Sequence, residues 1–104
     1  MSLTLSTHVL DTAVGRPAAG LRVRHERRDG DTWVPVGEHI TDDDGRVSGW
    51  AAEPGEHRFT FDTGAHLGPG AFYPEVSVVF RATEGHYHVP LLLSPFGYST
   101  YRGS

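Results

Sequence analysis

The sequence predicts an all-β fold, an antiparallel two-sheet sandwich or barrel of about eight short strands. Apolar and polar residues alternate with a period of two in many short segments. Glycine, proline and aspartate separate these segments at regular intervals, and no long segment has the spacing of an amphipathic helix. With 104 residues the chain has the size of one domain, so we assign residues 1–104 to a single domain.

The first half of the chain contains four predicted strands, at residues 3–10, 21–26, 33–41 and 47–50. In the first two, alternation gives each strand two distinct faces. Residues 15–20 connect these two strands. Aspartate and glycine at 29–31 and 42–45 predict tight turns, because aspartate tolerates turn geometry and glycine supplies a positive φ. The aspartate run at 42–44 lacks the spaced ligands of an EF-hand, so we interpret it as a turn.

The second half contains four more predicted strands, at residues 57–62, 75–81, 87–94 and 97–101. Pro54 and Gly55 interrupt the chain before the first of them. Residues 63–74 are the least regular segment and hold several glycines and prolines, so any helix there must be short.

The composition narrows the chemistry. Cysteine and lysine are both absent, which excludes disulfides, thiolate ligands, a cysteine nucleophile and a Schiff-base lysine. The net charge of −4 argues against a nucleic-acid partner. No apolar run approaches the ~18–20 residues of a membrane span, and the N-terminal residues lack the pattern of a signal peptide. We therefore expect a cytoplasmic protein without a membrane partner.

Seven histidines are the first candidates for chemistry. His8, His86 and His88 have strongly apolar neighbours. His86 and His88 share one face of a strand, and with His8 they could form an open zinc site, although two histidines at this spacing are also common in ordinary alternating strands. The other four are predicted to be solvated surface residues: His25, His39, His57 and His66.

Two further segments are unusual. The strand from Val89 to Leu93 is apolar on both faces, so one face should enter the core and the other should meet a partner, which we expect to be another subunit. The last residues continue an aromatic strand into Arg102, Gly103 and Ser104. Most termini fray, but this pattern predicts an end that is held in place.

Several ordered motifs resemble the 5-hydroxyisourate hydrolases, across essentially the whole chain. They are residues 5–11 (Leu-Ser-Thr-His-Val-Leu-Asp), 44–46 (Asp-Gly-Arg), 61–64 (Phe-Asp-Thr-Gly), 72–76 (Phe-Tyr-Pro-Glu-Val), 86–95 (His-Tyr-His-Val-Pro-Leu-Leu-Leu-Ser-Pro) and 101–104 (Tyr-Arg-Gly-Ser). The resemblance implies a transthyretin-like sandwich and hydrolysis of 5-hydroxyisourate in urate breakdown, without a cofactor or metal. One departure is the segment from Gly64 to Phe72, which is shorter than the family's helix-bearing loop.

The resemblance also implies the site. His8, Arg46 and His88 stand where transthyretin has Lys, Glu and Thr, and they would be catalytic, with the two histidines activating water. The family forms a homotetramer, a dimer of dimers whose sheets face a central channel. Tyr87, Val89, Leu91 and Leu93 would then fill the core. The substrate-binding residues would be Leu10, Pro90, Leu92, Ser99, Tyr101, Arg102, Gly103 and Ser104.

Three alternatives stay open at this point. A transthyretin-like carrier would bind a small aromatic ligand in the channel without turnover. A zinc hydrolase would use His8, His86 and His88. A non-catalytic immunoglobulin-like module would explain the fold but not the motifs.

Overall fold

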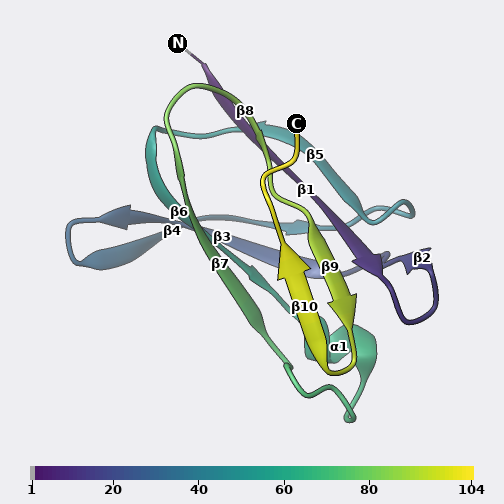
Figure 1. Ribbon diagram of the computed structural model, residues 1–104. Coiled ribbons are helices and arrows are strands. Elements are labelled where there is room, and N and C mark those ends of the chain that lie inside the picture. The colour runs from purple at the N-terminus through teal and green to yellow at the C-terminus, as the bar shows by residue number, and fades with distance from the viewer. Residues whose placement is uncertain (1) are drawn as a thin grey trace.

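The computed structural model describes residues 2–104, which form two β-sheets packed face to face (Figure 1). A six-stranded sheet contains β1 (Leu3–Asp11), β2 (Arg16–Pro17), β5 (Arg46–Ala51), β8 (Gly85–His88), β9 (Leu91–Ser94) and β10 (Gly97–Thr100). A four-stranded sheet has the order β4 (Thr32–Ile40), β3 (Arg22–Asp29), β6 (Gly55–Phe61) and β7 (Val76–Ala82). The one helix in this range, α1 (Thr63–Leu67), lies at the end of the sandwich opposite the two chain termini (Figure 1).

Strand β1 organises the six-stranded sheet. Its first half lies between β5, which is antiparallel to it, and β8, which is parallel. Its second half pairs with β2 and, in parallel, with β9. The parallel pairs depart from the purely antiparallel sandwich predicted above. They arise because β1 and β8–β9 are not joined by a hairpin, so a turn does not impose antiparallel pairing on them.

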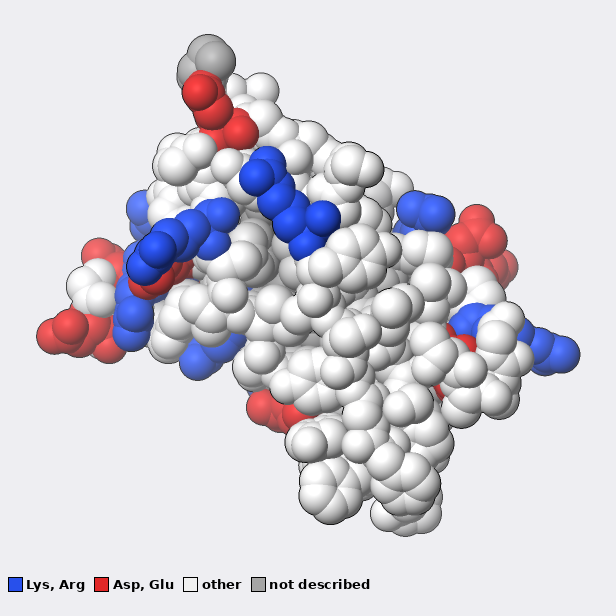
Figure 2. All heavy atoms as spheres, in the orientation of Figure 1, with Lys and Arg blue, Asp and Glu red and all other residues white. Residues whose placement is uncertain are grey.

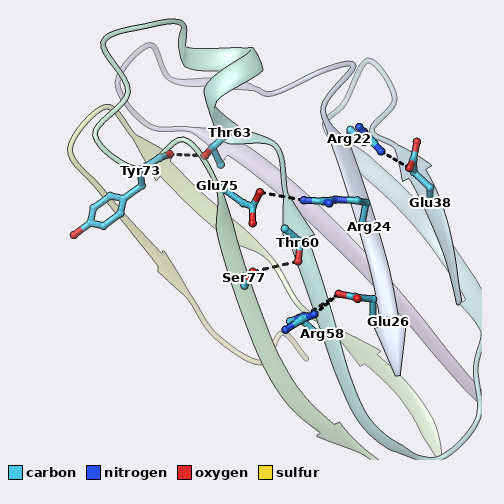
Figure 3. A network of polar contacts seen from close by, with 10 residues as sticks. All are labelled: Arg22, Arg24, Glu26, Glu38, Arg58, Thr60, Thr63, Tyr73, Glu75 and Ser77. Atoms are coloured by element: carbon cyan, nitrogen blue, oxygen red, sulfur yellow. Dashed lines mark hydrogen bonds and ion pairs between the residues drawn. The ribbon is translucent and has the colours of Figure 1, made fainter. Parts of the chain in front are cut away.

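The four-stranded sheet is antiparallel throughout and carries ion pairs on its outer face (Figure 3). Arg58 contacts Glu26 at 2.7 Å, and Arg24 contacts Glu75 at 3.1 Å. Such partly exposed pairs are typically worth about 0–1 kcal/mol each. This face is therefore a solvated surface with paired charges.

The core between the sheets is built from alternating apolar residues. Leu5 and Val9 of β1 and Phe59 and Phe61 of β6 are fully buried. Full burial of one such side chain is worth roughly 1.5–3 kcal/mol. Four residues of the late strands were predicted to fill the core. Three of them, Val89, Leu91 and Leu93, are buried, and the fourth, Tyr87, is half-buried and packs against the core.

Three predicted element boundaries differ from the structure. The strand predicted at 87–94 is split into β8 and β9, because Val89 and Pro90 leave the regular ladder and proline has no N–H to donate. The connection predicted at 15–20 contains the two-residue strand β2. The irregular segment does hold a helix, and its five residues confirm that it had to be short. In the described chain no helix is both long and apolar enough to cross a membrane.

The prediction that His25 and His57 are surface residues is wrong. His25 is 1% exposed and His57 0%. His25 shares a strand face with Val23, and His57 shares one with Phe59, so period two carries both imidazoles into the core.

Hydrogen bonds compensate for burying these two rings. Trp50 Nε1–H donates to His25 Nδ1 at 3.1 Å, His25 Nε2 lies 2.8 Å from His57 Nδ1, and His57 Nε2 lies 2.8 Å from the carbonyl oxygen of Glu53. Every ring nitrogen therefore has a partner. His39 is half-buried beside Trp50, and His66 bonds Asp11 at 2.9 Å.

Candidate active site

The candidate site lies on the outer face of the six-stranded sheet, where three strands bring polar side chains together. Period two sends Thr4, Ser6 and His8 of β1 to this face, while Leu5 and Val9 enter the core. Register then fixes the neighbours. Thr4 pairs with His86, Ser6 with His88, and His8 with Arg46, in order along β1.

An irregularity in β5 makes room beside these residues. Between Leu5 and Thr7 the register of β1 advances two residues, while β5 advances three, from Trp50 to Val47. Two residues of β5, Ser48 and Gly49, therefore lie opposite one residue of β1, which is a β-bulge. A Cβ at Gly49 would lie 3.3 Å from His86 Cε1, so glycine admits the His86 ring here.

His88 is held by its ring and by its backbone. Its Nδ1 lies 2.8 Å from Ser6 Oγ, and its carbonyl accepts a 2.8 Å hydrogen bond from the N–H of Gly103. The pKa of His88 is lowered, first by burial and next by repulsion from Arg46. His8 and His86 add smaller contributions of the same sign. A neutral imidazole near pH 7 can accept a proton from water.

His8 lies beside Arg46 and is fixed by the turn that precedes β5. Its Nε2 is 2.9 Å from the carbonyl oxygen of Asp44. Because a carbonyl oxygen only accepts hydrogen bonds, this nitrogen carries the hydrogen, and in the neutral ring Nδ1 holds the lone pair. The glycine of this turn is obligatory. Gly45 has a φ of +74°, and a Cβ there would lie 2.4 Å from the Val9 carbonyl oxygen.

The chain end is held against His88, as the aromatic C-terminal strand predicted. Gly103 and His88 form an antiparallel bridge. A Cβ on Gly103 would lie 2.5 Å from Cδ2 of His88 and 3.1 Å from its Cβ. No larger residue fits there without displacing the imidazole, which is the close approach expected of this glycine.

These elements enclose a hollow of about 360 Å³. Its size suits a small polar molecule, and its wall mixes cationic, imidazole and hydroxyl groups. The lining includes several residues that were not predicted as substrate contacts, among them Ser6, Ser48, Gly49 and His86. Ser6 could have been found, since it shares a strand face with His8. The full lining is Ser6, Thr7, Arg46, Val47, Ser48, Gly49, His86, His88 and Ser104.

The structure distributes the remaining predicted site residues around the hollow rather than in it. Leu10, Leu92 and Ser99 form one cross-strand row on β1, β9 and β10. Tyr101 is 57% exposed just beyond β10. These positions fit a face that a second subunit could cover.

Two further residues predicted as substrate contacts, Pro90 and Arg102, lie away from the hollow of a single chain. Pro90 is buried, because the break between β8 and β9 turns it inward next to Val89. The guanidinium of Arg102 lies over the ring of Tyr87, 4.4 Å from its centre. Tyr87 is on the strand face opposite His88, so Arg102 does not line this hollow.

The zinc arrangement is not supported by the placement of the histidines. Within residues 2–104 no group of three histidines or carboxylates is placed to hold a metal ion. His86 Nε2 and His88 Nδ1 both contact the Ser6 hydroxyl, and His8 Nε2 contacts the carbonyl oxygen of Asp44 instead.

Comparison with known proteins gives a consistent result. The model of the HIUase/Transthyretin family matches residues 5–103. The chain is 46% identical to the uric acid degradation bifunctional protein TTL of Arabidopsis thaliana, with 96% of the chain covered. It is 45% identical to the 5-hydroxyisourate hydrolase of Salmonella typhimurium, over 96% of the chain and 80% of that protein. The chain spans only 37% of the Arabidopsis protein.

Solved structures extend the comparison to the fold. The 5-hydroxyisourate hydrolase of Klebsiella pneumoniae superimposes with a TM-score of 0.87 at 34% identity, and each chain is covered completely. Sea bream transthyretin in complex with thyroxine gives a TM-score of 0.86 at 31% identity, over 95% of this chain and 93% of that one.

Proposed function

The chain belongs to the HIUase/Transthyretin family, and from this we propose that it is an enzyme that hydrolyses 5-hydroxyisourate to 2-oxo-4-hydroxy-4-carboxy-5-ureidoimidazoline. One observation carries the proposal. The hollow places a half-buried imidazole, His88, beside the permanent charge of Arg46, and His8 adjoins that arginine across the β1–β5 ladder. Hydrolysis of a cyclic amide needs a group that accepts a proton from water and a positive charge that stabilises the developing oxyanion.

The proposed reaction uses His8 and His88 for proton transfer. Water attacks the amide carbon while one imidazole accepts its proton, and negative charge develops on the carbonyl oxygen. The carbon–nitrogen bond then breaks, and the nitrogen receives a proton from an imidazolium. Arg46 lowers the pKa of His88 by repulsion, which favours the neutral ring, and stabilises the oxyanion. Ser104, which lines the hollow, would contact polar edges of the substrate ring.

We also propose that the active form is a homotetramer, a dimer of dimers with the candidate site facing a central channel. Exposed aromatic residues support this. In Figure 2 the end of the molecule near α1 shows a surface without charged side chains. Phe96 is 78% exposed and Phe72 66%, and Tyr98 packs edge-on against Tyr73. Large exposed apolar surfaces of this kind typically mark contacts between proteins.

The tetramer would also complete the site. Leu10, Leu92, Ser99 and Tyr101 lie outside the single-chain hollow, so their predicted contact with substrate would require a second subunit's face. Arg102 would likewise act across a subunit boundary. Light scattering in dilute solution tests this. An active monomer would contradict the channel proposal. A cytoplasmic location also remains a proposal, which fractionation of cells would test.

A substrate assay tests the function. Freshly generated 5-hydroxyisourate decays on its own, so its absorbance supplies an internal baseline. We expect the native protein to accelerate this decay, His88→Ala to lose the acceleration, and His66→Gln, with its histidine on α1, to retain it. The likeness to transthyretin makes a carrier the second candidate. A protein that binds the substrate but leaves the baseline decay unchanged would favour the carrier.

A further inference from the structure

Four side chains on the outer face form one continuous chain of hydrogen bonds that ends at His88. Thr4 Oγ1 lies 2.7 Å from His86 Nδ1, and His86 Nε2 lies 3.0 Å from Ser6 Oγ. The same Ser6 oxygen lies 2.8 Å from His88 Nδ1. The parallel register of β1 and β8 creates this arrangement, because it alternates a hydroxyl from one strand with an imidazole from the other.

The chain differs in kind from the buried histidine pair of the core. There, Trp50 can only donate and the Glu53 carbonyl can only accept, so the protons on His25 and His57 are fixed in one arrangement. In the site chain, both Thr4 and Ser6 contribute hydroxyls, which donate and accept. The direction in which these hydrogen bonds donate is therefore not fixed by the groups at the ends of the chain.

Two proton arrangements satisfy every bond of the site chain. In the first, His86 Nδ1–H donates to Thr4, Ser6 donates to His86 Nε2, and His88 Nδ1–H donates to Ser6. His88 Nε2 then holds a lone pair and is a base. In the second, all three bonds reverse, Nε2 of His88 carries the hydrogen, and its Nδ1 holds the lone pair. His88 can then donate the Nε2 proton when Nδ1 regains a proton through the chain. The required reaction uses a base first and an acid afterwards.

We propose that Ser6 and His86 are positioning residues that act through His88, and that the chain Thr4–His86–Ser6–His88 sets and reverses the proton-bearing nitrogen of His88 during hydrolysis. This inference rests on the proposed function. When Nε2 of His88 takes a proton from water, its Nδ1 proton passes to Ser6 Oγ and the Ser6 proton passes to His86 Nε2. One positive charge moves from His88 to His86, whose Nδ1–H still donates to Thr4. The two transfers run back when Nε2 of His88 protonates the leaving nitrogen, so the protons balance and no electrons are transferred.

The surroundings favour this direction of transfer. His88 is half-buried, while His86 is exposed, so water stabilises a charge on His86 better. Arg46, His8 and His86 are the titratable groups that lower the pKa of His88, with Arg46 the strongest of the three. Moving the charge one residue further along the strand face relieves the repulsion at His88. The bulge at Gly49 gives His86 its space.

The test compares Ser6→Ala with Ser6→Thr, which keeps the hydroxyl. Ser6→Ala should lower kcat about 10-fold to 100-fold, the cost typical of losing a partner that orients a functional imidazole, with KM nearly unchanged. It should also move the acid limb of the pH–rate profile, and Ser6→Thr should restore both. Ser77→Ala is the matched control. It removes a hydroxyl that bonds Thr60 on the other sheet and should change neither quantity. A Ser6→Ala enzyme with kcat within about twofold of native and the same profile would overturn the proposal.

An NMR measurement separates this inference from the proposed function. Nitrogen shifts of ¹⁵N-labelled imidazoles report which ring nitrogen is protonated, whether or not the protein turns over substrate. In the native protein the two rings should be coupled through Ser6, so that acidification moves the proton of His88 from Nδ1 to Nε2, and in Ser6→Ala this shift of the proton should be absent. Coupling without hydrolysis would keep the chain and reject the hydrolase. A native His88 whose ring proton stays on the same nitrogen throughout would reject the chain, even if hydrolysis occurs.

Discussion

Acidification should destabilise the sandwich through the buried pair His25 and His57. The hydrogen bonds of the pair allow only neutral rings, since Trp50 donates to one end and the Glu53 carbonyl accepts at the other. A further proton on His25 Nδ1 would face the indole N–H, and one on His57 Nδ1 would face the N–H of His25. Protonation therefore breaks a bond inside the core and buries a charge.

The magnitude follows from the lowered pKa values. Burial lowers the pKa of His25 from 6.5 to about 4, with His57 and then His39 adding repulsion. A gap of about 2.5 pKa units at about 1.4 kcal/mol each is worth about 3 kcal/mol. The pKa of His57 is also lowered, chiefly by burial. A small domain has about 5–15 kcal/mol of stability in total, so this loss is substantial.

The sign is set by which state binds the proton first. Above pH 6.5 His25 is neutral in both the folded and the unfolded protein, so its burial makes the free energy of unfolding no more dependent on pH. Below pH 6.5 the unfolded chain takes up protons that the folded protein refuses, so the free energy of unfolding falls until about pH 4. The stability contributed by the neutral ring is thus complete above the unfolded pKa and lost through this window.

Urea unfolding followed by circular dichroism at pH 7.5, 6.5, 5.5 and 4.5 measures the effect, at one protein concentration because assembly also contributes to apparent stability. His57→Gln keeps an acceptor toward His25 and a donor toward Glu53 but does not titrate. In this variant the free energy of unfolding should fall less steeply with decreasing pH, because unfolding takes up about one proton fewer. His66→Gln, on α1, should leave the decline as steep as in the native protein. A flat free energy between pH 7.5 and 4.5, or an unchanged slope in His57→Gln, would refute the reasoning.

Four further outcomes concern the site. His8→Ala and His88→Ala should each lower kcat by about 10²–10⁴-fold while the melting temperature stays close to native; retained activity in either would remove that residue from the mechanism. Gly103→Ala should reduce hydrolysis sharply, because its Cβ would lie 2.5 Å from His88, whereas Gly70→Ala meets no atom within 4 Å and serves as the control. The rate should fall as acid protonates His88, with a midpoint below pH 6.5, and Arg46→Ala should raise that midpoint; a native midpoint above 7 would contradict the lowered pKa. Activity should survive exhaustive chelation, and a loss that zinc restores would favour a metal mechanism.

Local pattern predicted most of the strands, because period two depends only on neighbouring residues. The same pattern also indicates that His25 and His57 are buried. His25 lies two residues from the core residue Val23, and His57 lies two residues from Phe59, so each shares a strand face with a core residue. Treating histidine as a surface residue by type obscured that signal. Burial of histidine is decided by available partners, here Trp50, and not by residue type.

Features that depend on long-range register could not be predicted. Nothing local to β1 shows that Ser6 faces His88, since their contact follows from parallel pairing of strands far apart in the chain. On either side of Pro90, β8 pairs with the first half of β1 and β9 with the second half, a long-range arrangement that the residues around Pro90 do not reveal. The position of Arg102 over Tyr87 likewise depends on the path of the last residues beside β8.

The pairing of β1 with β8 and β9 also determines when the protein can become active. The hydroxyl of Thr7 bonds the carbonyl of Val89 across 82 residues, and every wall of the hollow except β5 depends on this junction of the first and last strands. Such high contact order predicts slow folding, since the loop must close before its contacts are made. On the ribosome, β1 emerges early, and the edge that pairs with β8 and β9 stays unpaired until these last strands are synthesised. A nascent chain therefore holds no partial activity, and the site assembles in one late step.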